Sequence, residues 1–386
     1  MFKKLKGLAV IALISLIPTF LIWLPFFLKA SSFWNIPLPQ NGMATIVANY
    51  DGPLYIVVAK SLYAADIIKK MVPFSLPVEY YAAHFPLFPL LIKPLAAALG
   101  FPYSMLAVTV LGSILATYFF YKFTCLYFSS KDALWLTFVF SILPARWLVV
   151  RSVGSPEPLF IAAIIASLFY FRKEKYWLAG IWGAVAQLTK SPGILLFAAY
   201  FLALTIPNVK RVALEGFAKI FSVNKIIKFL PVFLIPISLL GIFVLYKIRL
   251  NDFFAYFHSG DNIHLFFPPF QIFNYSASWV GTFWLEEIIF VYLLGVIGFQ
   301  KLIQQKKHVL AWFVGVFFTT TLFVSHRDLI RYSLPIVPFL IIAYGDTIVK
   351  KEFKFAMLLL VIPIYLFSLA YISQNTMPIS DWAPLL

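Results

Sequence analysis

Long apolar runs alternate with short polar segments along the whole of this 386-residue chain. A helix needs roughly 20 apolar residues to cross a hydrocarbon core about 30 Å thick, and most of the runs approach that length. The run 176–207 is too long for one helix and is broken at Thr189-Lys190-Ser191-Pro192-Gly193, so we divide it into two short helices. The pattern predicts about 11 transmembrane helices. The other predicted spans are 8–28, 103–121, 133–150, 157–171, 229–248, 281–300, 308–325, 333–349 and 355–372.

Composition indicates the same class of protein. Apolar residue types make up 62% of the chain and charged types only 12%, which excludes a water-soluble enzyme, a disordered chain and a disulfide scaffold. The single cysteine, Cys125, excludes an intrachain disulfide and a thiolate metal cluster. We therefore predict an all-α polytopic membrane protein that forms a single domain over 1–386.

The basic residues indicate how the chain is oriented. The formal net charge is +16, and most of the excess lies in segments that face one side when the N-terminus is placed inside. Lys and Arg collect in cytoplasmic loops, so we interpret the excess as a topology signal and not as a nucleic-acid surface. The prediction is a multi-pass protein of the plasma membrane with a cytoplasmic N-terminus. Segment 1–28 is interpreted as a retained signal anchor in preference to a cleaved signal peptide.

Three segments between the spans have a character of their own. Segment 208–228 alternates apolar positions with Lys and Arg, which predicts a basic amphipathic helix on the inner leaflet, in contact with anionic lipids. Segments 29–102 and 249–280 are long and face outward. The first contains apolar pieces interrupted by prolines, which predicts interfacial helices too short to span the membrane. Functional residues tend to gather in such outer segments.

Charged residues at the outer ends of the helices are the candidates for chemistry, because such groups are costly near a membrane and usually face a cavity or a partner. Asp51 directly precedes a Gly-Pro pair and is the N-cap of a helix, a general base, or both. Arg151 either pairs with Glu157 or faces a bound anion. Lys190 lies in the break of the run 176–207, where it either binds an anionic ligand or extends to the interface.

Two further motifs contain candidate residues. Arg327 and Arg331 are four residues apart, so on a helix they share a face and form a fork for a phosphate; alternatively they pair with Asp328 or with a lipid head group. His84 and His326 have no second histidine or carboxylate at metal-ligand spacing. We therefore predict neither a metal nor another cofactor.

Several of these residues lie in motifs that resemble a known family. Tyr50-Asp51-Gly52-Pro53-Leu54-Tyr55, followed by Ala83-His84-Phe85-Pro86-Leu87-Phe88-Pro89, is similar to the first outer loop of the PIG-V family of mannosyltransferases. Ser155-Pro156-Glu157-Pro158-Leu159-Phe160 is similar to that family's Ser-Glu-x-Leu-Phe. Leu188-Thr189-Lys190-Ser191-Pro192-Gly193 is similar to its Leu-Thr-Arg-x-x-Gly, and Arg331-Tyr332 to its late Arg-Tyr segment. The matches follow one another in the family's order.

The chain also departs from the family pattern. Tyr50 replaces a Trp, Leu54 a common His, Leu62 a Gly and Lys190 an Arg. His84 replaces a Phe, so no family role carries over to it. The change at Leu54 concerns the identity of the acceptor. The short chain and its very small loops resemble those of bacterial or archaeal proteins, so the eukaryotic glycolipid-anchor substrate is not carried over to this chain.

The resemblance implies a GT-C-type fold and a membrane glycosyltransferase, of mannose or another hexose, that works on the outer face of the membrane. It implies a polyprenyl-phosphate-sugar donor, a glycolipid or glycan acceptor, inversion at the anomeric carbon, and Asp51 as catalytic base. The cations would neutralise the leaving phosphate, which needs no paired catalytic acid. The expected substrate-binding residues are Tyr50, Tyr55, His84, Arg151, Glu157, Lys190, Arg327 and Arg331.

Two other functions remain as alternatives. A transporter or flippase of lipid-linked sugars would use the same cations without chemistry, and Glu286-Glu287 could then couple protons. The sequence contains no two-halved inverted repeat, which transporters often have. An oligosaccharide polymerase or ligase would need arginine-rich outer loops, and those of this chain are modest. The oligomeric state is left open.

Overall fold

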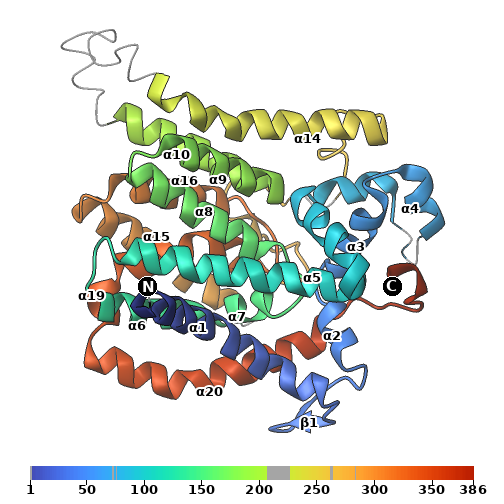
Figure 1. Ribbon diagram of the computed structural model, residues 1–386, viewed down its shortest axis with the longest axis horizontal. Helices are drawn as coiled ribbons and strands as arrows, with labels where there is room; N and C mark the ends of the chain where they lie inside the picture. The colour runs from blue at the N-terminus through green and yellow to red at the C-terminus, as the bar shows by residue number, and fades with distance from the viewer. Residues whose placement is uncertain (1, 72–73, 75, 207–226, 261–263, 283) are drawn as a thin grey trace.

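The computed structural model is a bundle of helices with one small antiparallel hairpin, formed by β1 (Ser32–Phe33) and β2 (Ile36–Pro37). The structure describes residues 2–71, 74, 76–206, 227–260, 264–282 and 284–386. The longer helices run roughly along one direction, and the short helices α2 to α4 gather at one end of the bundle, together with the last residues of the chain (Figure 1).

The bounds of the described helices follow from the backbone. The α-helices are α1 (Phe2–Phe27), α2 (Met43–Val47), α3 (Gly52–Ser61), α4 (Ala65–Met71), α5 (Leu87–Thr124), α6 (Ser130–Ile142), α7 (Ala145–Arg151), α8 (Glu157–Arg172), α9 (Tyr176–Thr189), α10 (Ile194–Thr205), α14 (Leu234–Leu250), α15 (Leu285–Gln304), α16 (His308–Thr321), α17 (Leu329–Ser333), α18 (Val337–Ala343), α19 (Gly345–Ile348) and α20 (Lys351–Gln374). The 3-10 helices are η1 (Val78–Ala83), η2 (Ser191–Gly193), η4 (Leu230–Phe233), η5 (Gln271–Phe273), η6 (Leu334–Ile336) and η7 (Ala383–Leu385).

Length and apolar composition decide which helices can cross a membrane. In the described part of the chain, 4 helices satisfy both conditions, and up to 5 spans result if the bent pair α6 and α7 counts as one. Shorter apolar helices, α16 among them, accompany these. The architecture is that of an all-α multi-pass membrane protein, and the expected number of about 11 spans stays a prediction.

Three expected spans differ in shape from the sequence expectation. The span 333–349 is divided into η6, α18 and α19. The span 103–121 is part of the 38-residue helix α5, which begins in the outer segment and changes direction at Gly100 (φ 71°). A side chain is strained at such a φ, and glycine is not. The span 133–150 is broken into α6 and α7, which are bent by 74° around Pro144. Proline has no N–H to donate and clashes with the preceding turn, so the helix ends before it.

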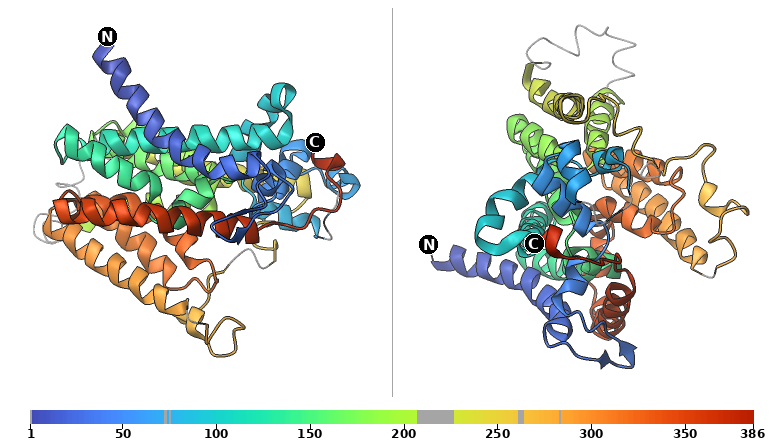
Figure 2. Two further views of the ribbon diagram at one scale, coloured as in Figure 1. Left: turned by 90° about the horizontal axis from the view of Figure 1, so that it is seen from below. Right: turned by 90° about the vertical axis from the view of Figure 1, so that its right-hand side faces the viewer.

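Helix α8 forms the centre of the bundle. All its residues from Glu157 to Phe169 are buried, and it packs against α5 on one side and α9 on the other. The backbones of α5 and α8 approach closely, because a Cβ at Gly112 would come within 2.7 Å of the Leu159 nitrogen. Helices α15 and α16, in orange, form a layer on the side of α20 away from α1 (Figure 2). The start of α8 is therefore held from several sides.

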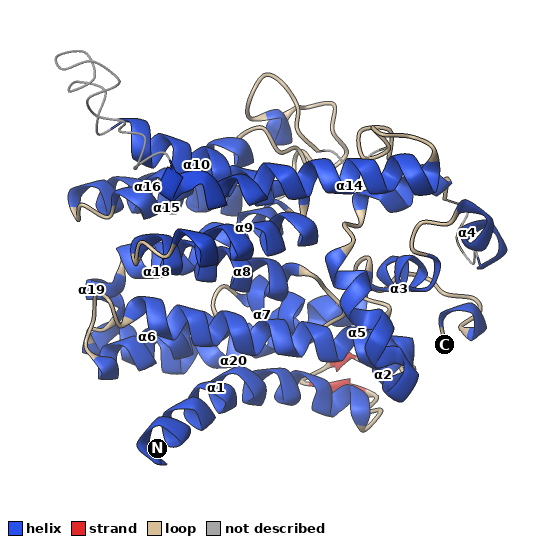
Figure 3. Cartoon of the chain, turned by 45° about the horizontal axis from the view of Figure 1, so that its top comes forward, coloured by secondary structure: helices blue, strands red, loops and turns tan. Residues whose placement is uncertain are grey.

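The first outer segment, 29–102, contains the hairpin and the short helices α2, α3, α4 and η1 (Figure 3). Most of α3 is buried, so this segment is packed onto the bundle. The second outer segment, 249–280, is largely irregular and pairs with the chain beyond α16 through the Leu265–Val324 bridge. The predicted basic helix 208–228 lies outside the described residues, apart from its last two positions.

Candidate active site

Asp51 lies at the junction where the first outer segment enters α3. It occupies the N-cap position, but its side chain makes no capping hydrogen bond. The preceding Tyr50 has a left-handed backbone (φ 49°), and a Cβ at Gly52 would come within 2.6 Å of the Val47 carbonyl oxygen, so only glycine fits there. The Asp51 carboxylate, 41% exposed, lines a pocket instead of closing the helix end.

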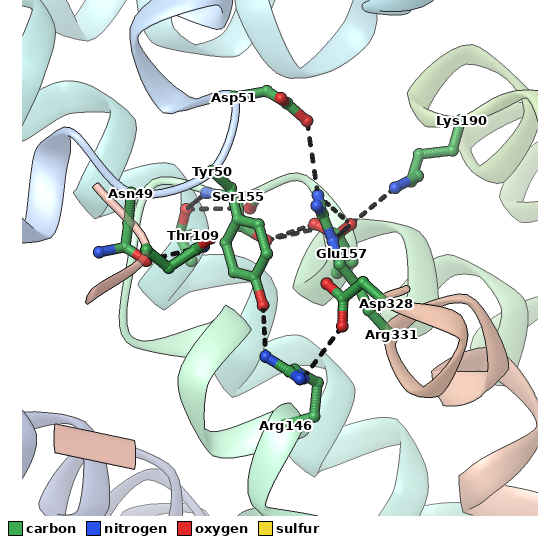
Figure 4. Close-up of polar contacts among 11 residues, drawn as sticks. Asn49, Tyr50, Asp51, Thr109, Arg146, Ser155, Glu157, Lys190, Asp328 and Arg331 are labelled. Atoms are coloured by element: carbon green, nitrogen blue, oxygen red, sulfur yellow. Dashed lines mark hydrogen bonds and ion pairs between the residues drawn. The ribbon is translucent and has the colours of Figure 1, made fainter. Parts of the chain in front are cut away.

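Glu157, the first residue of α8, organises the charges of this pocket (Figure 4). Its Oε1 accepts from Lys190 Nζ at 2.6 Å and from Arg331 Nη2 and Nε at 2.7 and 2.8 Å. Its Oε2 accepts from the Ser155 hydroxyl. The carboxylate is 4% exposed, and a buried carboxylate is stable only when it is paired in this way. Glu157 thus holds two cations on one side of the pocket.

Arg331, on α17, links this carboxylate to Asp51. Its Nη2 lies 3.7 Å from Asp51 Oδ2, an ion-pair distance that is too long for a hydrogen bond. Its guanidinium stacks 4.0 Å from the centre of the Tyr50 ring. The carboxylate of Asp51 is therefore close to a positive charge but is not locked by it.

Lys190 lies at the break between α9 and α10, as the sequence indicates. Its extended backbone ends α9, and η2 follows with Pro192 at its second position. The turn is tight, because a Cβ at Gly193 would come within 2.5 Å of the Gln187 Cα. The Lys190 side chain, 26% exposed, points into the bundle towards Glu157 and not towards the interface. The break between the two helices thus places the Lys190 ammonium group in the pocket.

The pocket has a volume of about 120 Å³ and is lined from the first outer segment, α8, the α9–α10 break and α17. It borders an apolar groove of about 300 Å³, which extends between α10, α14, α16 and the second outer segment. The two cavities share lining residues, namely Ser191, Pro192, Tyr256, Phe317 and Tyr332. A small charged pocket is therefore continuous with a larger apolar one.

Tyr55 and His84 form an aromatic part of the pocket wall. Both are buried and line the pocket, with their rings 4.8 Å apart in an edge-to-face arrangement. The Nδ1 atom of His84 has no hydrogen-bond partner among the described residues. Burial lowers the pKa of His84, and the nearby Asp51 only partly opposes this shift. The ring is therefore a neutral group in the wall at neutral pH.

A second layer of charge lies behind Tyr50, which does not itself line the pocket. Arg146 Nε pairs with Asp328 Oδ1 at 3.1 Å, and Arg146 Nη1 donates to the Tyr50 hydroxyl at 3.3 Å. The same guanidinium lies 3.6 Å from the Tyr371 ring. This layer fixes the tyrosine under Arg331. This layer could not be predicted from the sequence, because Arg146 lies in α7, whose direction is set by the bend after α6.

Besides Tyr50, two expected substrate-binding residues lie outside the pocket, Arg151 and Arg327. Arg151 is fully buried and does not line the pocket: its guanidinium donates to the Ser141 carbonyl and to the carbonyl and hydroxyl of Ser15. It therefore satisfies a carbonyl that the end of α6 leaves free and ties that end to α1. Its expected alternative, a pair with Glu157, is absent too, since the ion pairs of that carboxylate in the described structure are with Lys190 and Arg331.

Arg327 does not form a fork with Arg331. Helix α17 begins only at Leu329, so Arg327 lies before the helix and is exposed, whereas Arg331 points into the pocket. The four-residue spacing puts two side chains on one face only when both are helical. The alternative expectation for these arginines, a pair with Asp328, is not formed either, because Arg146 takes that position.

The described residues contain no group of three His, Cys, Asp or Glu side chains that could hold a metal ion. His326 lies instead beside His264, with ring centres 4.4 Å apart. Burial and the neighbouring His264 lower the pKa of His326 to about 4. The expectation that the site works without metal or cofactor stays a prediction.

The helical membrane fold of the chain is of the GT-C type. The solved structure of ArnT from Cupriavidus metallidurans, bound to undecaprenyl phosphate, is similar to 83% of this chain with a TM-score of 0.55 and 14% sequence identity. The chain spans 60% of the length of ArnT. No family model matches the sequence, and no curated protein matches it. Membership of the PIG-V family therefore stays a prediction, whereas the fold class is confirmed.

Proposed function

We propose that the chain is a membrane glycosyltransferase that moves a hexose, such as mannose, from polyprenyl phosphate to a hydroxyl group of a glycolipid or glycan on the outer face of the plasma membrane. The observation that carries this proposal is the arrangement of charge in the pocket. A half-exposed carboxylate, Asp51, lies beside two cations, Lys190 and Arg331, which a buried carboxylate, Glu157, holds in place.

The cations suit the phosphate of the donor. A lysine carries three N–H donors and an arginine five. Glu157 engages the Nζ of Lys190 and the Nε and Nη2 of Arg331, so both side chains keep donors for a second anion. Donors already held in position cost no reorganisation when negative charge develops on the leaving phosphate. ArnT, which shares the fold, is bound to a lipid phosphate of this class.

The apolar groove beside the pocket suits the lipid chain of the donor. Its lining is mainly aromatic and aliphatic and includes Leu239 and Phe243 of α14. A polyprenyl chain is apolar along its length, so it can lie against such a lining without leaving polar groups unpaired. With its phosphate at Lys190 and Arg331, the donor would present its sugar to Asp51.

Asp51 is the proposed base. Its carboxylate makes no capping bond and no hydrogen bond to Arg331, so it can accept a proton from the acceptor hydroxyl. That oxygen then attacks the anomeric carbon as the bond from this carbon to the phosphate oxygen breaks. The electron pair of the broken bond leaves with polyprenyl phosphate, and the configuration of the sugar inverts.

The direct experiment uses the full chain in liposomes with polyprenyl-phosphate mannose and a membrane glycolipid extract as acceptor. We expect Asp51→Asn to lower transfer by about 10³-fold, the usual range for loss of a general base. Asp66→Asn is the matched control, because this exposed carboxylate lies in the same outer segment and does not line the pocket. Equal activity of wild type and Asp51→Asn would contradict the proposal.

The same liposomes separate transfer from transport. A flippase would move the lipid-linked sugar across the bilayer without a new glycosidic bond, and Asp51→Asn would leave that movement unchanged. Mass spectrometry of the lipids detects the bond, and a membrane-impermeant sugar-oxidising reagent detects the movement. Movement without bond formation would favour the transporter over the transferase.

A further inference from the structure

A second charged pocket lies at the other end of α8. Glu157, in the pocket described above, is the first of the 16 residues of this helix, and Arg172 is the last, so about 22 Å along the helix axis separates the two. Around Arg172 lies a pocket of about 250 Å³, which we call the basic pocket. It is lined by Tyr127, Arg172, Lys306, Lys307 and His308, with the next two residues of α16. Two segments distant in sequence, the end of α8 and the chain just before α16, therefore bring cations together beside Tyr127, at the end of the bundle that we predict to be cytoplasmic.

Lys307 is held in position before any ligand arrives. Its Nζ donates to Gln305 Oε1 at 2.6 Å and lies 4.7 Å from the centre of the Tyr127 ring. The side chain is half-buried, and burial lowers the pKa of its ammonium group. A positioned and partly desolvated cation loses little side-chain entropy when it binds an anion.

The cations of the basic pocket lack the counter-charge that Glu157 provides at the other end. No carboxylate of the described residues forms an ion pair with Arg172, Lys306 or Lys307, and Asp346 acts on Lys307 only from a longer range. Helix α16 begins at the pocket wall with neither a side-chain cap nor an acidic residue in its first turn. Its first N–H groups and its positive dipole end add to the field of the cations.

We propose that the basic pocket binds a phosphate group, carried by an anionic lipid head group or by soluble phosphate. Arg and Lys donate to phosphate oxygens, and N–H groups at a helix start do the same. Basic pockets between membrane helices on the cytoplasmic side bind lipid head groups in this way. This site contains no catalytic carboxylate and is independent of the function proposed for the pocket at Asp51.

The test measures the thermal unfolding midpoint of the full chain in a neutral detergent. The probes are phosphatidylglycerol, zwitterionic phosphatidylcholine and inorganic phosphate, each titrated separately. The pocket variant is Arg172→Gln with Lys307→Gln. The control, Lys131→Gln with Lys351→Gln, removes the same charge from exposed residues at the starts of α6 and α20. A ligand that binds only the folded chain raises the midpoint.

We expect phosphatidylglycerol, but not phosphatidylcholine, to raise the midpoint of wild type and of the control. In the pocket variant the half-saturating concentration should rise by at least about tenfold. The same pattern with inorganic phosphate supports the proposal with soluble phosphate as the source. Lys306 is exposed, so Lys306→Gln leaves the packing of Lys307 intact, and it should weaken binding of the same ligand. Equal responses of the pocket variant and the control would overturn the proposal.

Discussion

The two ends of α8 carry charge in opposite ways. At its first residue, two cations lie beside two carboxylates, Glu157 and Asp51, and each of the four side chains is within ion-pair distance of one of opposite charge. At its last residue, Arg172 and its neighbours have no carboxylate in ion-pair contact among the described residues. The balanced pocket can position a base beside a leaving phosphate, whereas the unbalanced one can only attract an anion. On the proposals made above, the unpaired cations would bind a phosphate group, and the paired charges would take part in the chemistry.

Removal of Arg331 should have the largest effect on the pocket at Glu157. Arg331→Met leaves the buried Glu157 with Lys190 as its remaining ion-pair partner, and the loss of the hydrogen bonds from the guanidinium to this carboxylate costs about 1.5 to 3 kcal/mol. It also removes a donor for the leaving phosphate, worth about 10²- to 10³-fold in turnover. We expect both a lower thermal midpoint and a transfer rate at least about 10²-fold lower.

Arg327→Met is the matched control for that variant. It removes an exposed arginine only four positions away, outside the pocket. Transfer by this variant should equal that of wild type. A loss as large as that of Arg331→Met would restore the two-arginine fork that the sequence predicts and contradict the position of Arg327 in the structure.

Glu157→Gln should make the pocket at position 157 resemble the basic pocket, because its cations would then lack a carboxylate partner at this position. The amide keeps the shape of the side chain and can still accept a hydrogen bond, but the two cations lose their shared negative partner. We expect tighter binding of the donor phosphate, by about tenfold, and slower release of polyprenyl phosphate, so that KM and kcat fall together. Steady-state kinetics against donor concentration measures both. A raised KM would mean that Glu157 contacts the substrate itself.

Much of the balanced pocket could be predicted from the sequence. Asp51, Glu157, Lys190 and Arg331 each lie in a local motif, at a helix start, a helix break or an Arg-Tyr pair, and the structure brings these motifs together. Arg151 and Arg146 could not be placed. Their surroundings depend on the 74° bend between α6 and α7, and the bend brings distant helices into contact with them. The basic pocket could not be predicted either, because it joins three segments that are distant in sequence.

Filling the apolar groove should weaken only donors with long lipid chains. Leu239→Trp places a larger side chain in the groove, and we expect KM for a long-chain donor to rise by about tenfold, because the lost burial involves a few methylene groups. A short-chain analogue should be unaffected. Leu240→Trp is the control, since that residue is 56% exposed and lies outside the groove. Equal changes for the two donors would remove the groove as the lipid site.

The smallest effect concerns His84 and pH. Burial holds the pKa of His84 below its ordinary value of 6.5, so the unfolded chain binds a proton that the folded chain resists. Its contribution to stability is complete above about pH 6.5 and is lost as the pH falls towards the folded-state pKa. We expect the thermal midpoint of His84→Gln to fall less than that of wild type between about pH 7 and 5. Parallel curves for the two proteins would show that the ring does not titrate in this window.

The central claim is that Asp51 acts on the reaction and not on the fold or on donor binding. Its most direct test measures binding of polyprenyl-phosphate mannose and turnover in the same preparation of Asp51→Asn. We predict that the variant binds the donor about as tightly as wild type while its turnover falls by about 10³-fold. A variant that loses donor binding in proportion to turnover, or that keeps its turnover, would contradict the assignment of Asp51 as the base.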